Sequence, residues 1–258
     1  MSGASPCAAC RKRCCANYTV SINGYDVFVI SKTLHLLPES YLIYFPVTDR
    51  NERGFLLDPG GNRYEIALDK AGHYQKGNPC IFWIELSHGG GRCGIYSHRP
   101  MVCQTYPAYQ QQEIVVLRDD VLCPEGAWNL AGMELGTFRE RLSRFRMQQD
   151  IYAYIVAAWN DAIERANRRM TVREYYTALL NIYESLDRWT ADIPSEERND
   201  FVRKWGGLPP ASPNPLFADT ASSEDDPRWR LFIAALREHI RGAAPWFAEA
   251  RKVGSAAA

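Results

Sequence analysis

Apolar residues recur at helical spacing through the second half of the chain. From Phe138 onward they return every three, four or seven positions, which predicts one face of a long amphipathic helix. Thr137 and Glu140 form a capping box at its start, and Thr171 and Glu174 form another before a second stripe. The two stripes consist of Phe138, Leu142, Phe145, Tyr152, Ile155, Val156, Trp159 and Ile163, then Tyr175, Leu179, Ile182, Tyr183, Leu186 and Trp189.

The first half of the chain shows short apolar runs separated by turn signals such as Asn23-Gly24 and Asp58-Pro59-Gly60-Gly61. The runs are rich in Val, Ile, Tyr and Phe, which is typical of strands. The predicted strands are Tyr18–Ile22, Asp26–Ser31, Tyr41–Val47, Tyr64–Leu68, Ile81–Leu86 and Glu113–Leu117. The long helices that alternate with strands in a doubly wound sheet are missing here, so we expect an irregular α+β region.

Composition narrows the class of protein. The chain has 258 residues, 46% hydrophobic and 23% charged, as in globular proteins of one or two domains. Lys and Arg number 30, as do Asp and Glu, so bulk charge gives no support for a nucleic-acid partner. No apolar run is long enough to span a bilayer, and the N-terminus lacks the apolar core of a signal peptide. We therefore expect a cytoplasmic protein without a membrane span.

All eight cysteines lie in the first half of the chain. In the cytoplasm thiols stay reduced, so a dense cysteine pattern indicates metal binding or catalysis before disulfides. Two thiolates spaced as Cys-x2-Cys can bind one tetrahedral metal ion, and soft sulfur ligands select zinc or iron–sulfur clusters. The predicted metal ligands are Cys7, Cys10, Cys14, Cys15, Cys80, Cys93, Cys103 and Cys123.

Three features of this ligand set predict how the site behaves. The long gap between Cys15 and Cys80 means that the site closes only when the chain folds, so metal binding and folding should be coupled. Neighbouring side chains point apart in helices and strands, so Cys14 and Cys15 are expected to have different roles. Four thiolates around Zn²⁺ or a [4Fe–4S]²⁺ core carry a formal charge of about −2, which favours nearby cations. The candidate cations are Arg11, Lys12, Arg13, Arg92 and Arg99.

The cysteine pattern resembles the YkgJ-type family of zinc- or iron-chelating cysteine-cluster proteins. The resemblance covers residues 7–126, and Gln104 departs from the pattern where the family usually has Arg. It rests on Cys7-x2-Cys10-x3-Cys14-Cys15, Asn78-Pro79-Cys80, Cys93-Gly94-Ile95-Tyr96-Ser97-His98-Arg99-Pro100-Met101-Val102-Cys103-Gln104-Thr105-Tyr106-Pro107 and Cys123-Pro124.

The resemblance implies a metal site whose metal the residues leave open. The flagellin lysine N-methylases share the cysteine pattern and use S-adenosylmethionine, which implies a metal-dependent modifying enzyme, by analogy a protein lysine N-methyltransferase. The alternative is a non-catalytic zinc- or iron-binding or redox module. Thiolate-only ligation and the methylase relatives favour an iron–sulfur cluster over zinc. His98, midway between Cys93 and Cys103, is a weaker candidate ligand.

Together these patterns predict an α+β protein with an irregular, metal-stapled N-terminal region of short strands and a helical C-terminal half. The predicted division is an eight-cysteine domain over residues 1–126 and a helical region over 127–258 that packs on it. Shorter helices are expected over 195–205 and 227–241. A protein or small-molecule substrate is expected, and the residues specify neither the catalytic groups nor the oligomeric state.

Overall fold

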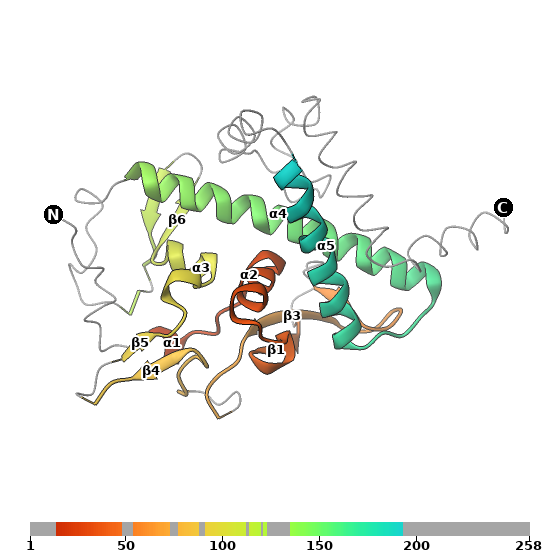
Figure 1. Ribbon diagram of the computed structural model, residues 1–258, viewed down its shortest axis with the longest axis horizontal. Coiled ribbons are helices and arrows are strands. Elements are labelled where there is room, and N and C mark those ends of the chain that lie inside the picture. Colours follow the sequence, from red (N-terminus) through yellow and green to blue (C-terminus); the bar gives the residue numbers. More distant parts are fainter. Residues whose placement is uncertain are drawn as a thin grey trace. The chain divides into compact units, whose positions relative to one another are not determined.

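A computed structural model describes residues 14–47, 54–72, 77–87, 91–111, 114–119, 121–122 and 135–192. Within these ranges short helices and strands come first and two long helices follow (Figure 1). The helices are α1 Cys14–Asn17, α2 Gly24–Leu34, α3 Met101–Thr105, α4 Leu135–Ala166 and α5 Val172–Asp192, with single 3-10 turns at Pro38–Ser40 and Tyr96–His98. The strands are β1 Leu42–Pro46, β2 Phe55–Leu56, β3 Arg63–Leu68, β4 Trp83–Glu85, β5 Gly91–Cys93, β6 Ala108–Gln111 and β7 Ile114–Leu117. The predicted α+β class is confirmed.

The chain divides into two compact units. The first consists of Met1–Ile22, Val29–Ile43 and Ile66–Phe145, and the second of Asn23–Phe28, Tyr44–Glu65 and Arg146–Ala258. The described cysteines all belong to the first unit. Each unit draws on segments that are distant in sequence. The predicted division near residue 126 remains a prediction about how the parts fold.

Short antiparallel strands form three small sheets, ordered β1-β3-β2, β4-β5 and β6-β7. Tyr18–Ile22 is not a full strand, but Ser21 forms a bridge with Ala67. The predicted strands that the structure confirms correspond to β1, β3, β4 and β7. Strands β2, β5 and β6 were not predicted. Of these, β5 carries no β-branched or aromatic residue.

The predicted strand Asp26–Ser31 is wrong, since this segment lies inside helix α2. The reason is a reciprocal cap. Asn23 Oδ1 accepts a hydrogen bond from the Asp26 N–H at 3.0 Å, and Asp26 Oδ2 accepts one from the Asn23 N–H at 3.4 Å. Val27 and Ile30, three residues apart, are both fully buried, as one helix face requires. The Asn-Gly pair therefore starts a helix here and is not a hairpin turn.

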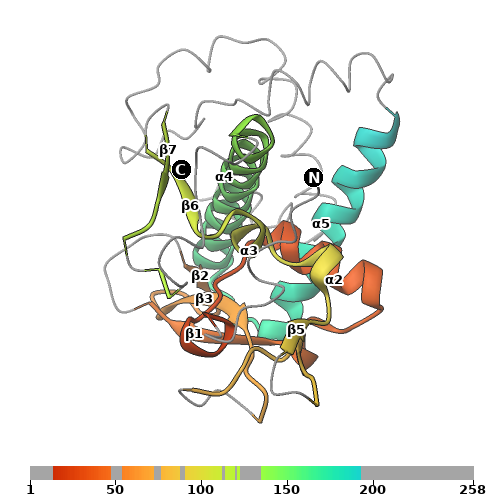
Figure 2. The same ribbon diagram turned by 90° about the vertical axis from the view of Figure 1, so that its left-hand side faces the viewer.

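In the first unit, the β6–β7 hairpin packs against the start of α4. Its register pairs Ala108 with Leu117 and Gln111 with Ile114, and Figure 2 shows the two strands side by side. Ala108, Val115 and Leu142 form a buried cluster, with Leu117 and Phe138 packed against it.

In the second unit, aromatic side chains pack against one another in the core. The Phe55 ring stacks on Tyr175 with centroids 3.9 Å apart, and Trp159 meets Tyr175 edge-on at 5.1 Å. Trp159 Nε1 donates a hydrogen bond to the Leu56 carbonyl at 2.8 Å. The buried Asn160 side chain accepts from the Leu56 N–H at 2.7 Å and donates to the Gly54 carbonyl at 2.9 Å. These bonds satisfy the short strand β2, which would otherwise leave buried backbone groups unpaired.

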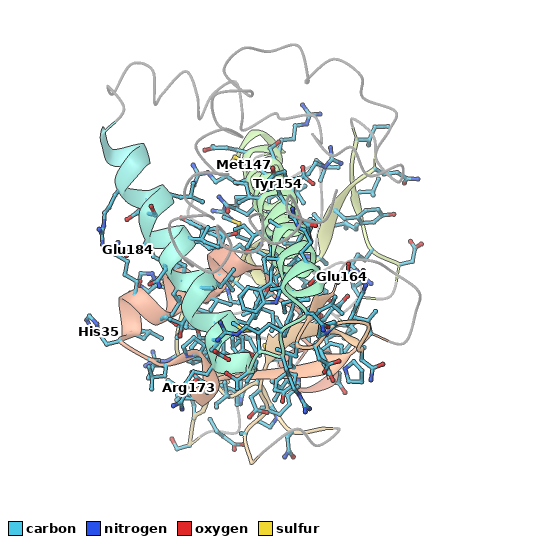
Figure 3. All side chains as sticks on the ribbon, turned by 90° about the vertical axis from the view of Figure 1, so that its right-hand side faces the viewer. His35, Met147, Tyr154, Glu164, Arg173 and Glu184 are labelled. Atoms are coloured by element: carbon cyan, nitrogen blue, oxygen red, sulfur yellow. The ribbon has the colours of Figure 1, made fainter. Side chains whose placement is uncertain are left out.

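The start of α5 confirms the second capping box. The Glu174 N–H donates to Thr171 Oγ1 at 3.2 Å, and Glu174 Oε2 accepts from the Thr171 N–H at 2.8 Å. The hydrogen bond from the Thr171 N–H lowers the pKa of the Glu174 carboxyl. Figure 3 shows Arg173 and Glu184 at different points along this helix. The helices predicted over 195–205 and 227–241 lie outside the described residues, as does the side chain of Thr137.

Among the described residues, none of the helices is long and apolar enough to cross a membrane.

Candidate metal centre

The structure places five of the eight predicted ligands. Cys14 and Cys15 begin α1, Cys80 precedes β4, Cys93 ends β5 and Cys103 lies in α3. Cys80 is buried, and the other four are partly buried. Cys7, Cys10 and Cys123 lie outside the described residues. The identity of the metal ligands therefore remains a prediction.

A backbone hydrogen bond joins Cys15 to Cys80. The Cys80 N–H donates to the Cys15 carbonyl at 3.0 Å, across a long stretch of intervening sequence. The segment around Cys80 is held in turn by an antiparallel bridge to Lys70. Two flanking bonds extend this bridge, from the Ile81 N–H to the Asp69 carbonyl and from the Ala71 N–H to the Pro79 carbonyl, both at 2.9 Å.

The β4–β5 hairpin brings Cys93 into the same region. The Trp83 N–H donates to the Cys80 carbonyl at 2.8 Å, so a turn leads directly from Cys80 into β4. Trp83 is the cross-strand partner of Cys93, and the side chains of such a pair lie on the same face of the hairpin. The Trp83 indole covers Gly91 on this face, and a Cβ at Gly91 would collide with it. Cys80 and Cys93 thus lie on one compact hairpin.

Helix α3, which carries Cys103, is tied to the segment that follows α1. The Tyr106 ring packs against Tyr18 with centroids 6.0 Å apart, and the Tyr18 N–H donates to the Cys14 carbonyl at 2.9 Å. The Tyr106 hydroxyl also accepts from the N–H of Leu122, the residue before Cys123 in the sequence. Tyr106 therefore connects three segments that carry or adjoin a cysteine. These are α3 with Cys103, the segment of Tyr18 after α1, and Leu122 before Cys123.

Cys14 and Cys15 occupy the first two positions of the four-residue helix α1. A hydrogen bond from the Cys14 side chain lowers the pKa of Cys15 to about 7, against the opposing effect of burial. The expectation that the two side chains diverge and have different roles remains a prediction.

For the other two thiols of this region, burial is the largest effect on the pKa. It raises the pKa of Cys80 to about 11 and also raises the pKa of Cys93. The negative charge of Cys15 adds to both increases. Thiolate is the ligand form of cysteine, so a cation that binds here must displace the Cys80 proton.

Lys70 is a site residue that the sequence analysis missed. Its side chain is only 4% exposed, and its Nζ donates to the carbonyls of Cys15 at 2.7 Å and Tyr18 at 2.6 Å. The ammonium lowers the pKa of both Cys15 and Cys80. Lysine is seldom buried without a partner, but a single Lys in an apolar segment gives no local signal of its long-range contacts.

Of the predicted cations, Arg99 is the one that the structure places beside the thiols. Its positive charge lowers the pKa of Cys15 and of Cys93, while its guanidinium lies 4.2 Å from the Tyr96 ring centroid. Gln104 Nε2 donates to the Arg99 carbonyl at 2.7 Å, so the residue that replaces the family's Arg supports the Arg99 backbone. Arg92 is exposed, and residues 11–13 are outside the described ranges.

The described part of the site is incomplete as a chelating set. Within the described ranges, no three His, Cys, Asp or Glu side chains form a group that could hold a metal ion. His98 lies in the exposed 3-10 turn Tyr96–His98. The donors that are present are soft sulfurs with cations beside them, which fits zinc or an iron–sulfur cluster in chemistry.

The chain matches one protein family. The family model CxxCxxCC, described as "Putative zinc- or iron-chelating domain", matches residues 6–124. Over these residues the chain is similar to that family. The match covers every predicted cysteine ligand, from Cys7 to Cys123, and confirms the resemblance of the cysteine pattern. Searches of curated proteins and of solved structures found no significant match.

The vicinal pair of this domain yields a testable difference. Cys15→Ser should abolish metal binding, because Cys15 holds the stabilised thiolate and a Ser hydroxyl is a poor, hard ligand. Cys14→Ser should leave more metal bound, since it removes a donor to that thiolate. Metal counted per chain in both variants, with the spectrum recorded, checks this. Identical loss from the same site would mean that both sulfurs bind one metal equally.

Proposed function

We propose that this protein binds an iron–sulfur cluster, or alternatively zinc, through cysteine thiolates of residues 7–123. The observation that carries the proposal is geometric: the Cys80 N–H donates to the Cys15 carbonyl at 3.0 Å, and the β4–β5 hairpin that follows Cys80 pairs Trp83 with Cys93. These thiols come from segments far apart in sequence and share one region of the first unit. The family match over residues 6–124 supports the same conclusion.

The donor chemistry favours an iron–sulfur cluster. Cysteine thiolates alone are the usual ligands of such clusters, whereas zinc sites often include histidine. His98, the candidate histidine of this region, is exposed. When bound, the cluster would supply either electron transfer or a rigid cross-link between the cysteine-bearing segments. The chain itself supplies the thiols, the backbone ties between them and the neighbouring cations.

Metal analysis after anaerobic purification tests the proposal. We expect brown protein that contains iron and acid-labile sulfide, with a broad visible absorption. Colourless protein that holds stoichiometric zinc under the same conditions would reverse the choice of metal and retain the metal site. Protein that binds neither iron nor zinc, even after reconstitution with iron and sulfide, would contradict metal binding altogether.

Whether the protein also modifies a substrate is a separate question. The expectation of a modifying enzyme, of S-adenosylmethionine as co-substrate and of a protein or small-molecule partner remains a prediction. A structural zinc site is closed and a catalytic one keeps an open position, so exogenous ligands distinguish the two. A shift in the metal spectrum on adding S-adenosylmethionine would support the enzyme, and an unchanged spectrum would favour the non-catalytic module. Cytoplasmic location likewise remains a prediction.

A further inference from the structure

The buried Lys70 ammonium needs a compensating charge. Its two hydrogen-bond acceptors, the carbonyls of Cys15 and Tyr18, are neutral groups. Within the described ranges, no carboxylate pairs with it, and the Asp69 carboxylate instead accepts a bond from the Lys70 backbone N–H at 2.7 Å. A buried charge carries a large desolvation penalty unless an opposite charge lies near it.

The thiolates of the segments that hold Lys70 can supply that opposite charge. The two carbonyls that hold the Lys70 ammonium belong to α1 and to Tyr18 just after it, so Nζ is fixed beside the backbone of Cys15. Lys70 is also the bridge partner of Cys80. An ammonium has three N–H groups, and the two carbonyls use two of them. The cation is thus fixed between two segments that each carry a predicted ligand.

Arg99 gives a second positive charge in this region. It lowers the pKa of Cys15 and of Cys93, whereas Lys70 lowers the pKa of Cys15 and of Cys80. The Tyr96 ring below the guanidinium and the Gln104 bond to its backbone restrict its position. Cys15 is therefore the thiol that both cations share.

We propose that Lys70 is the buried counter-cation of a four-thiolate metal centre, with Arg99 as its partly exposed second. Four thiolates on Zn²⁺ or on a [4Fe–4S]²⁺ core carry a formal charge of about −2, which one lysine and one arginine balance. This inference rests on the proposed metal-binding function. It makes Lys70 a positioning residue, which holds α1 against the Cys80 segment and offsets the charge of the bound centre without ligating the metal.

Substitution of Lys70 tests the role of its charge. Lys70→Gln removes the charge, Lys70→Arg keeps it, and the exposed Lys32→Gln is the matched control. Each variant is purified as the full chain, and its metal affinity is measured by competition with a chelator of known affinity. We expect K70Q to bind ~10–100-fold more weakly, which is the usual cost of losing an outer-shell partner. K70R should retain more affinity than K70Q, and K32Q should match the wild type.

The outcomes separate this inference from the function on which it rests. Wild-type protein that binds no metal would contradict the proposed function. Wild-type and K70Q proteins that bind equally well, or equal losses in K70Q and K70R, would overturn the charge role of Lys70 alone. Circular dichroism checks that K70Q is folded. If K70Q is not folded, Arg99→Gln replaces it as the test, since Arg99 is partly exposed. We expect Arg99→Gln to bind metal more weakly than the wild type, with a smaller loss than K70Q. Unchanged metal affinity in Arg99→Gln would contradict the proposal.

A spectroscopic readout adds a test that a merely structural role would not pass. In protein loaded with an iron–sulfur cluster, removing a nearby positive charge disfavours the more negative, reduced state. The reduction potential of the K70Q cluster should therefore be more negative than that of the wild type. An unchanged potential in a fully loaded K70Q protein would overturn the inference.

Discussion

Cys80→Ser is expected to abolish metal binding and to loosen the first unit. Cys80 is buried, and its backbone N–H ties it to Cys15 while its carbonyl accepts from Trp83 at the start of β4. A Ser hydroxyl at this position is a hard, weak ligand for zinc or iron. Structural zinc contributes about 10–16 kcal/mol of binding free energy in small domains, so losing one ligand should remove a large part of the stability that metal supplies. Metal analysis and hydrogen exchange measure the two effects.

Metal-stripped wild-type protein is the control that separates the loss of metal from the loss of the packed Cys80 thiol. If the metal carries the effect, Cys80→Ser and stripped wild type should show similar loss of protection in the first unit. Residues 146–192 should keep more protection in both samples, because the helical stripes and aromatic core of the second unit make their own contacts. Equal loss in both units would indicate one cooperative structure, and full metal content in the variant would exclude Cys80 as a ligand.

Local signals explain which elements could be predicted. The capping box of Thr171 and Glu174 lies within four residues, and the helix that follows it begins as expected. Strand β3 was also predicted, because its sequence alternates the apolar Tyr64, Ile66 and Leu68 with other residues. Helix α2 was missed because Asn23-Gly24 is compatible with both a hairpin turn and a helix N-cap, and a short apolar run fits a strand or a buried helix equally well. The Asn23 side chain, which accepts a hydrogen bond from the Asp26 N–H, decides between them.

The same difference between local and long-range signals explains which parts of the candidate metal site could be predicted. The ligand types could be proposed because cysteine spacing is a local pattern, and the family match covers the same residues. The geometry between the cysteines could not be predicted. It depends on the register of Trp83 against Cys93 in the β4–β5 hairpin, and β5 has no β-branched or aromatic residue. Lys70 escaped prediction for the same reason, because its partners at Cys15 and Tyr18 lie more than 50 residues away. Contacts of this length follow from tertiary packing, which composition and periodicity do not encode.

Trp159→Ala is expected to be the most damaging substitution in the second unit. Trp159 is 1% exposed, packs edge-on against Tyr175 and donates from Nε1 to the Leu56 carbonyl. Truncation of a buried aromatic to Ala costs ~3–5 kcal/mol, and here it also leaves a buried carbonyl without its donor. Trp159→Phe should cost less, since it keeps most of the apolar contact and loses mainly the hydrogen bond. Denaturant unfolding of the metal-loaded protein measures both changes.

The exposed Glu164 on the same helix is the matched control, and Figure 3 shows it on α4. Glu164→Ala should change the free energy of unfolding by less than ~0.5 kcal/mol, as for most surface positions. Metal content should stay unchanged in all three variants, because the predicted ligands belong to the first unit and Trp159 to the second. A loss below ~1 kcal/mol in Trp159→Ala would contradict the assignment of this indole to the core. Loss of metal in the same variant would show that the two units depend on each other for stability, since truncation of a core residue would then reach the metal centre.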